Sequence, residues 1–266
     1  MSLVPPIPIR ATAFGARQGD AVIASRQGLC AYRDPVDIIS AKTVEDVVPA
    51  LRKVDAAVAL GKQALGYVAY EAAPAFDPAL CVHQSASLPL LWFALYDASI
   101  HPPNGLAGAF DVGAWAPRVT QETYEATIAA LRSRIAAGDT YQVNYTFPME
   151  AAFHGDAYAL FQALCANQRA DHCAFINTGR FQIASVSPEL FFRLDGNSLT
   201  TKPMKGTRPR GRWPEEDARI ARELRESEKD RAENVMIVDL LRNDMGRISQ
   251  TNSVTVTRLF DVERYP

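Results

Sequence analysis

A long alternation of apolar and polar residues, closed by a turn, is the feature that most constrains how this chain can fold. From Ala184 to Leu194 every second residue is apolar, and most of the residues between them are polar. Successive side chains of a β-strand point to opposite faces, so this pattern is typical of a half-buried strand. The sequence Asp195-Gly196-Asn197 that follows is a strong turn signal. The segment 181–205 is therefore predicted to form a long antiparallel hairpin.

The length of the turn decides which residues of this hairpin face each other. A three-residue loop would place Ser187 opposite Lys205 and make Glu189 and Lys205 diagonal neighbours, about 7–8 Å apart. A two-residue loop, Asp195-Gly196, would place Lys202 opposite Glu189 and turn Lys205 to the other face. Either register brings a lysine near the Glu189 carboxylate. A surface ion pair worth about 0–1 kcal/mol would explain the pattern equally well.

The other elements indicate a mixed chain with helices and strands. The Pro- and Gly-rich stretch 101–117 is predicted to connect a shortened N-terminal α/β region, residues 1–112, to a second region, residues 118–266. The last fourteen residues alternate like a strand that lacks a partner, and we expect a chain that has been cut short. Helices are predicted over 45–60, 120–138, 156–168, 214–227 and 229–245, and strands over 65–70, 88–96, 141–153 and 173–177.

Lys205 lies at the predicted end of the hairpin and is followed by a Gly- and Arg-rich loop. Desolvation and cationic neighbours lower the proton affinity of a lysine, and the neutral amine is a nucleophile. Arg208, Arg210 and Arg212 could hold an anionic substrate through bidentate contacts. A solvated basic loop without catalytic function is the alternative interpretation.

Three acidic residues, Glu226, Asp230 and Glu233, share one face of a predicted helix. Like charges at this spacing repel each other, so we expect Lys229, Arg231 or a bound cation to relieve the repulsion. Mg²⁺ takes one or two carboxylates together with anionic substrate oxygens. A solvated acidic face would give the same spacing. Further along this helix, Asp239 lies in an apolar run and is expected to pair with Arg242 or Asn243, because such a run is too apolar for an exposed helix.

Composition excludes several classes of function. The 28 Lys and Arg residues against 30 Asp and Glu residues leave a net charge of −2, which argues against a nucleic-acid binder. The most apolar stretch, residues 88–96, is half as long as the ~18 residues that a membrane span needs, and the N-terminus has no signal-peptide pattern. We therefore expect a cytoplasmic protein with no membrane or nucleic-acid partner. The four cysteines lack zinc-site spacing.

Four segments taken together give the sequence a resemblance to a known family. Their order and spacing resemble those of the chorismate-utilising enzymes and, within them, component I of aminodeoxychorismate synthase. The resemblance covers roughly residues 118–266 and rests on these segments: Gly138-Asp139-Thr140-Tyr141-Gln142-Val143-Asn144, Ser187-Pro188-Glu189, Pro203-Met204-Lys205-Gly206-Thr207, and Lys229-Asp230-Arg231-Ala232-Glu233-Asn234 running on to Val238–Asp244.

The resemblance implies an activity and a site. Lys205 matches the lysine nucleophile of aminodeoxychorismate synthases, where anthranilate synthases have a small residue. Glu189 matches the general acid/base, Glu233 matches a carboxylate of the Mg²⁺ site, and Gly206, Thr207 and Arg208 belong to the substrate loop. The implied reaction is the amination of chorismate to 4-amino-4-deoxychorismate for folate and para-aminobenzoate synthesis. The ammonia would come from a glutamine amidotransferase subunit.

The implied fold is α+β: the N-terminal part of the α/β sandwich of anthranilate synthase component I, with mostly antiparallel sheets and flanking helices. This chain ends near the middle of the family's catalytic domain, so residues 118–266 would be the first half of that domain, and the core would be incomplete. Two alternatives stay open. The chain could be an anthranilate or salicylate synthase, or a catalytically incompetent fragment or binding subunit.

Overall fold

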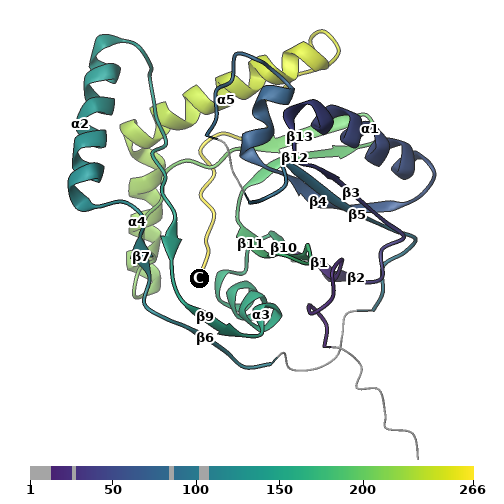
Figure 1. The fold of residues 1–266 in the computed structure, drawn as a ribbon. Helices are drawn as coiled ribbons and strands as arrows, with labels where there is room; N and C mark the ends of the chain where they lie inside the picture. The colour runs from purple at the N-terminus through teal and green to yellow at the C-terminus, as the bar shows by residue number, and fades with distance from the viewer. Residues whose placement is uncertain (1–12, 26–27, 84–86, 102–107) are drawn as a thin grey trace, which may run out of the picture. The chain divides into compact units, whose positions relative to one another are not determined.

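The computed structural model describes residues 13–25, 28–83, 87–101 and 108–266 and divides the chain into two compact units. Unit 1 consists of Met1–Gly105 and Leu160–Pro266, and unit 2 of Leu106–Ala159. The ribbon in Figure 1 shows helices together with small antiparallel sheets. The α+β class expected from the sequence is confirmed.

The first sheet of unit 1 joins strands that lie far apart in the sequence. It has four antiparallel strands in the order β11-β10-β1-β2. The bounds are Ala21–Ser25 for β1, Gly28–Tyr32 for β2, His172–Asn177 for β10 and Gln182–Ser187 for β11. β10 is the strand predicted over 173–177, whereas β1 and β2 are too short to show a clear alternation. Residues from the front of the chain and from the predicted catalytic region thus share one sheet.

The second sheet has three antiparallel strands in the order β3-β5-β4. They are β3 (Asp37–Ala41), β4 (Gln63–Val68) and β5 (Leu91–Tyr96). The central strand β5 is buried on both faces, which explains its unbroken apolar sequence. Its odd positions Leu91 and Phe93 pack in the cluster that contains residues of helix α1 (Val44–Ala59). Its even positions Trp92 and Tyr96 pack in a second cluster, with residues of the four-stranded sheet.

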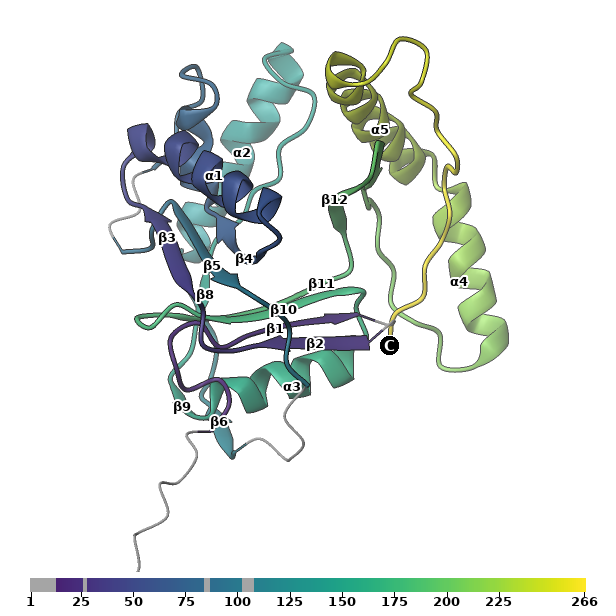
Figure 2. The ribbon, with the colours of Figure 1, turned by 90° about the vertical axis from the view of Figure 1, so that its right-hand side faces the viewer.

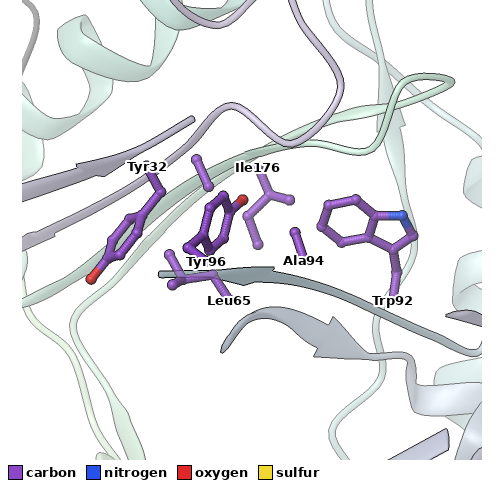
Figure 3. Close-up of a cluster of buried hydrophobic side chains, with 7 residues drawn as sticks. Tyr32, Leu65, Trp92, Ala94, Tyr96 and Ile176 are labelled. Carbon is purple, nitrogen blue, oxygen red and sulfur yellow. The ribbon is translucent and has the colours of Figure 1, made fainter. Parts of the chain in front are cut away.

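Figure 3 shows this second cluster, in which Tyr96 is nearly inaccessible to solvent. The ring of Tyr96 lies 5.1 Å from that of Tyr32, centroid to centroid. Its hydroxyl donates a hydrogen bond of 2.6 Å to the carbonyl of Gly19. Burial raises the pKa of Tyr96, so this hydroxyl stays protonated as a donor. The hydroxyl of Tyr67, at the edge of the cluster, is also buried, yet it has no hydrogen-bond partner among the described residues.

The remaining elements of unit 1 are a further hairpin and several helices. A two-stranded hairpin consists of β12 (Leu190–Asp195) and β13 (Ser198–Lys202) and precedes helices α4 (Pro214–Glu226) and α5 (Glu228–Ile248). The short helix η1 spans Tyr70–Ala75, and α3 (Ala157–Gln168) begins in unit 2 and ends in unit 1. All five predicted helices are confirmed. None of the helices in the described ranges is long and apolar enough to cross a membrane.

Unit 2 consists of two short β-ribbons and one long helix. β6 (Phe110–Val112) pairs with β9 (Phe153–Gly155), and β7 (Ala116–Pro117) pairs with β8 (Met149–Glu150). Helix α2 (Gln121–Ala137) begins at Thr120, whose side chain accepts a hydrogen bond from the Thr123 amide, and ends at Gly138 in the left-handed conformation. Both are residue types that favour these cap positions.

The strand predicted over 141–153 is wrong for most of its length. Residues 141–148 form no regular element, and pairing begins only at Met149. Tyr145 and Phe147 instead place their rings 5.8 and 5.9 Å from that of Tyr124 on α2. Pro148 also has no amide hydrogen for a ladder. Aromatic packing against a helix therefore replaces strand pairing here.

The two buried tyrosine hydroxyls give a matched pair of stability predictions. Tyr96→Phe leaves the Gly19 carbonyl without its buried partner, and we expect a loss of about 1–3 kcal/mol in the free energy of unfolding. Tyr67→Phe removes a hydroxyl that is buried without a partner, so it is expected to be neutral or stabilising. Urea unfolding followed by circular dichroism measures both, and equal losses in the two variants would contradict this interpretation.

Candidate active site around Lys205

Glu189 lies where the predicted long strand breaks in two. β11 ends at Ser187 and pairs with β10, whereas β12 begins at Leu190 and pairs with β13, so the single strand predicted over residues 182–194 is wrong. Pro188 cannot donate a ladder hydrogen bond, which accounts for the break. The Ser187 hydroxyl accepts from the Glu189 amide at 3.2 Å and fixes this corner. Glu189 therefore lies in the connection between β11 and β12 and belongs to neither strand.

The sequence left two hairpin registers open, one with a three-residue loop and one with the two-residue loop Asp195-Gly196. The observed register differs from both at the turn but agrees with the first at the open end of the hairpin. Asp195 pairs with Ser198, so the turn has two residues, Gly196 and Asn197. An irregularity between Leu190 and Arg193 then shifts the register, and Leu190 pairs with Lys202. This last pairing is that of the predicted three-residue loop. The ladder ends there, however, so Ser187 and Lys205 do not pair.

The Glu189 carboxylate contacts the peptide that precedes Lys205. Its Oε1 atom accepts a hydrogen bond of 2.9 Å from the amide of Met204. Glu189 is exposed and Lys205 is half-buried. Among the residues that the structure describes, no carboxylate forms an ion pair with the Lys205 amine. The structure therefore brings the carboxylate of the candidate acid to the backbone of Met204, the residue before the candidate nucleophile.

The loop after Lys205 contacts the side chain of Asp230 in helix α5. Gly206 has φ +78°, and a Cβ atom there would lie 3.1 Å from each of three Asp230 side-chain atoms. Arg208 Nη2 donates to Asp230 Oδ2 at 2.8 Å, and Arg208 Nη1 donates to the carbonyl of Thr207. Asp230 lies in the first turn of the helix, and the hydroxyl of the N-cap residue Ser227 accepts a hydrogen bond from its amide. Ser227, and then Arg208, hold the pKa of the Asp230 carboxyl below its usual range.

The other two arginines of the loop bind carboxylates in the first turn of α4. Arg210 makes a bidentate contact with Asp217, at 2.7 and 3.0 Å, and the Gly211 amide adds a third hydrogen bond to that carboxylate. Arg212 pairs with Glu216 at 3.3 Å. The arginines predicted to hold an anionic substrate thus bind acids of this chain. Arg210, and then Gly211, hold the pKa of Asp217 far below its usual range.

The final residues of the chain lie against the same loop. No strand forms in residues 253–266, so the predicted terminal strand is wrong. Arg264 pairs with Asp217 at 3.1 Å, and the Tyr265 carbonyl accepts from Arg210 at 2.7 Å. Glu263 pairs with Lys202. Figure 2 shows this segment, in yellow, running from α5 past α4. Side-chain contacts, rather than a ladder, hold it in place.

Helix α5 carries Glu233, the candidate magnesium ligand. The acidic repulsion predicted on this face is relieved by Arg208 from the loop and by the charge of Lys229, as predicted for Lys229. Arg231 instead stacks over the Phe260 ring at 4.3 Å. Asp239 pairs with Arg242 as expected, at 3.0 Å. The apolar run beside it was expected to be buried, but Leu240 is 56% exposed.

The chemistry of Glu233 fits a magnesium ion, but the surroundings form no complete cage. In the described part of the chain, no three acidic, histidine or cysteine side chains lie close enough to hold a metal. Asp230, one turn before Glu233, is occupied by Arg208. Mg²⁺ keeps several waters and substrate oxygens and needs only one or two carboxylates. Glu233 can supply one of them.

Two anchoring carboxylates were not identified as such from the sequence. Helical spacing groups Asp230 with Glu226 and Glu233, and it does not single out Asp217. The available signal was an acidic first turn, Glu215-Glu216-Asp217, placed a few residues after three closely spaced arginines. Alternating basic and acidic clusters of this kind indicate a loop folded back on the following helix.

Comparisons with known proteins show which family the chain belongs to. A family model described as chorismate binding enzyme matches residues 100–266, which is more than half of the chain. The chain therefore belongs to the chorismate binding enzyme family. It is similar to aminodeoxychorismate synthase component 1 of Klebsiella aerogenes, with 41% identity over 153 residues, 58% of this chain and 34% of that one. Anthranilate synthase component 1 of Streptomyces coelicolor is 37% identical over 57% of this chain and 30% of its own.

A solved structure confirms the fold. Anthranilate synthase component I from Streptococcus pneumoniae superposes on all of this chain and 68% of its own, with a TM-score of 0.72 and 20% identity. This supports the expected antiparallel architecture. The match to the curated relatives spans about a third of their length.

The loop anchor at Asp217 predicts a pH-dependent stability. Because the pKa of Asp217 is lower in the folded state, its ionised form adds stability above the ordinary aspartate pKa of about 3.9. That contribution is lost as the pH falls through the folded value. We expect wild type to exceed Asp217→Asn in unfolding free energy by a constant amount above about pH 5, and the gap to shrink below about pH 4.

Urea unfolding between pH 7 and pH 3 measures this gap. Asp55→Asn is the matched control, because Asp55 is exposed on α1, makes no ion pair with a described residue and carries the same charge. A gap for Asp217→Asn that stays the same from pH 5 to pH 3 would contradict the anchoring role.

Proposed function

We propose that this chain carries the lysine-bearing part of a site that aminates chorismate to 4-amino-4-deoxychorismate. The observation that carries the proposal is the hydrogen bond from the Met204 amide to Glu189, which brings a carboxyl group to the peptide that presents Lys205. Membership of the chorismate binding enzymes supports the substrate. Identity of 41% to a relative named aminodeoxychorismate synthase component 1 supports the reaction.

The chemistry uses one amine and one carboxyl group. The Lys205 amine attacks C2 of chorismate, the ring double bonds shift, and the C4 hydroxyl leaves as water after it takes a proton from Glu189. Ammonia then attacks C4, the double bonds shift back, and the bond between C2 and the lysine breaks. Lys205 is thereby regenerated, and covalent catalysis divides one difficult substitution into two easier ones.

A magnesium ion would be held by Glu233 together with oxygens of the substrate. When bound, it would supply positive charge that neutralises a chorismate carboxylate. Glu233 lies one helical turn after Asp230, whose partner Arg208 belongs to the Lys205 loop. This proximity along α5 is what supports its assignment to the same site.

The ammonia would be supplied by a separate glutamine amidotransferase subunit, and the product would serve folate synthesis through para-aminobenzoate. Relatives named anthranilate synthase component 1 favour a second candidate, conversion of chorismate to anthranilate. Lys205 distinguishes the two, because the family resemblance places a small residue at this position in anthranilate synthases.

Removing Lys205 should abolish amination. In an assay of the purified 266-residue chain with chorismate, ammonium and Mg²⁺, we expect Lys205→Ala to form no detectable 4-amino-4-deoxychorismate. Glu189→Gln should slow its formation by about 10²–10⁴-fold, because it removes proton transfer to the leaving hydroxyl. Lys53→Ala, which removes an exposed lysine of α1, is the matched control and should keep the wild-type rate.

Two outcomes would contradict this assignment. If Lys205→Ala formed 4-amino-4-deoxychorismate at the wild-type rate, Lys205 would not be the nucleophile. If the wild-type chain consumed chorismate but released anthranilate, the second candidate would hold.

A further inference from the structure

Two carboxylates hold the chain on either side of Lys205, and only one of them belongs to the proposed chemistry. We infer that the other, Asp230, is a positioning residue that fixes the Lys205 loop through Arg208 and through close contact with Gly206. The inference rests on the proposed function for its catalytic consequence. The contacts themselves are independent of it.

Asp230 is a buried anion with a defined partner outside its own helix. It is 9% exposed, and its Oδ2 atom accepts a charge-assisted hydrogen bond of 2.8 Å from Arg208. A buried carboxylate is costly unless it is paired, so the structure gains by keeping Arg208 in place. The pair thus links helix α5 to the loop three residues after Lys205.

Gly206 brings the loop backbone directly onto this carboxylate. Its φ of +78° lies in the left-handed region that glycine adopts without strain. A Cβ atom would come within 3.1 Å of Asp230 Cβ, Cγ and Oδ1. Absence of a side chain at residue 206 therefore permits both the turn and the close approach.

These contacts restrict Lys205 from both directions. The amide of Met204 is held by Glu189 at 2.9 Å, and Gly206 lies against Asp230. A side chain whose backbone is fixed on both sides samples a smaller volume. Misplacement of a reacting group by about 1 Å can cost about 10²-fold in rate. Asp230 would therefore affect catalysis without touching the substrate.

Limited trypsin digestion tests the hold on the loop directly. Trypsin cleaves after Lys and Arg but not before proline, and proline follows both Lys202 and Arg208. The Lys205–Gly206 bond is thus the only cleavable bond between these two residues. We expect Asp230→Asn, which keeps the shape of the side chain, to accelerate its cleavage about tenfold. The Lys53–Val54 bond in α1 reports global unfolding in the same digest.

The outcomes separate positioning from general stability. Faster cleavage at Lys205 with an unchanged rate at Lys53 supports the inference. An unchanged rate at Lys205, or an equal increase at both bonds, overturns it. A double-mutant cycle adds a second criterion: if Asp230 acts through Arg208, the double variant with Arg208→Ala is cleaved no faster than the faster single variant. Additive effects would overturn the coupling.

The catalytic consequence has its own measurement. For amination of chorismate, we expect Asp230→Asn to lower kcat about tenfold and to change KM by less than about twofold. A change in KM alone would overturn the positioning role. If the wild-type chain does not aminate chorismate, the proposed function fails, and the digestion still decides whether Asp230 holds the loop.

Discussion

Pairing between arginines and carboxylates determines the shape of the segment that carries Lys205. Arg208 binds Asp230 of α5, and Arg210 binds Asp217 of α4, so one loop is tied to two helices within three residues. Neither a strand ladder nor an apolar core holds this loop. Charge-assisted hydrogen bonds are directional and about twice as strong as neutral ones, which suits a segment that must be both exposed and fixed. Glu189 adds the third tie, to the backbone at Met204.

The hydrophobic core of unit 1 fixes the strand that leads to Glu189. Apolar residues of β5 alternate between the cluster shared with the four-stranded sheet and the cluster shared with α1. β11, which ends at the corner before Glu189, belongs to that four-stranded sheet. The position of the carboxyl group therefore follows from sheet pairing, whereas that of the amine follows from side-chain ties. The family model of chorismate binding enzymes matches residues 100–266, and a solved anthranilate synthase component I shares the fold.

Local sequence patterns predicted the helices and several of the strands, because caps, glycines and helical periodicity act over a few residues. Thr120 and Gly138 show this at the two ends of α2. Predictions failed where long-range contacts decided the outcome. Residues 184–194 alternate apart from Phe191, yet the two halves join different sheets on either side of Pro188. Residues 253–266 alternate as well, yet they are held by Asp217 and Arg210 rather than by a strand. For the site, motif resemblance names Lys205, Glu189 and Glu233 as candidates, and these assignments stay predictions. The pairing of each loop arginine depends on folding and could not be assigned from spacing.

The identity of the product formed from chorismate and ¹⁵N-labelled ammonium in the presence of Mg²⁺ tests the central claim most directly. Mass spectrometry distinguishes 4-amino-4-deoxychorismate, which keeps the enolpyruvyl group, from anthranilate, which has lost it. The account predicts labelled 4-amino-4-deoxychorismate from the wild-type chain. Labelled anthranilate, an unlabelled isomer such as isochorismate, or the absence of turnover would contradict it.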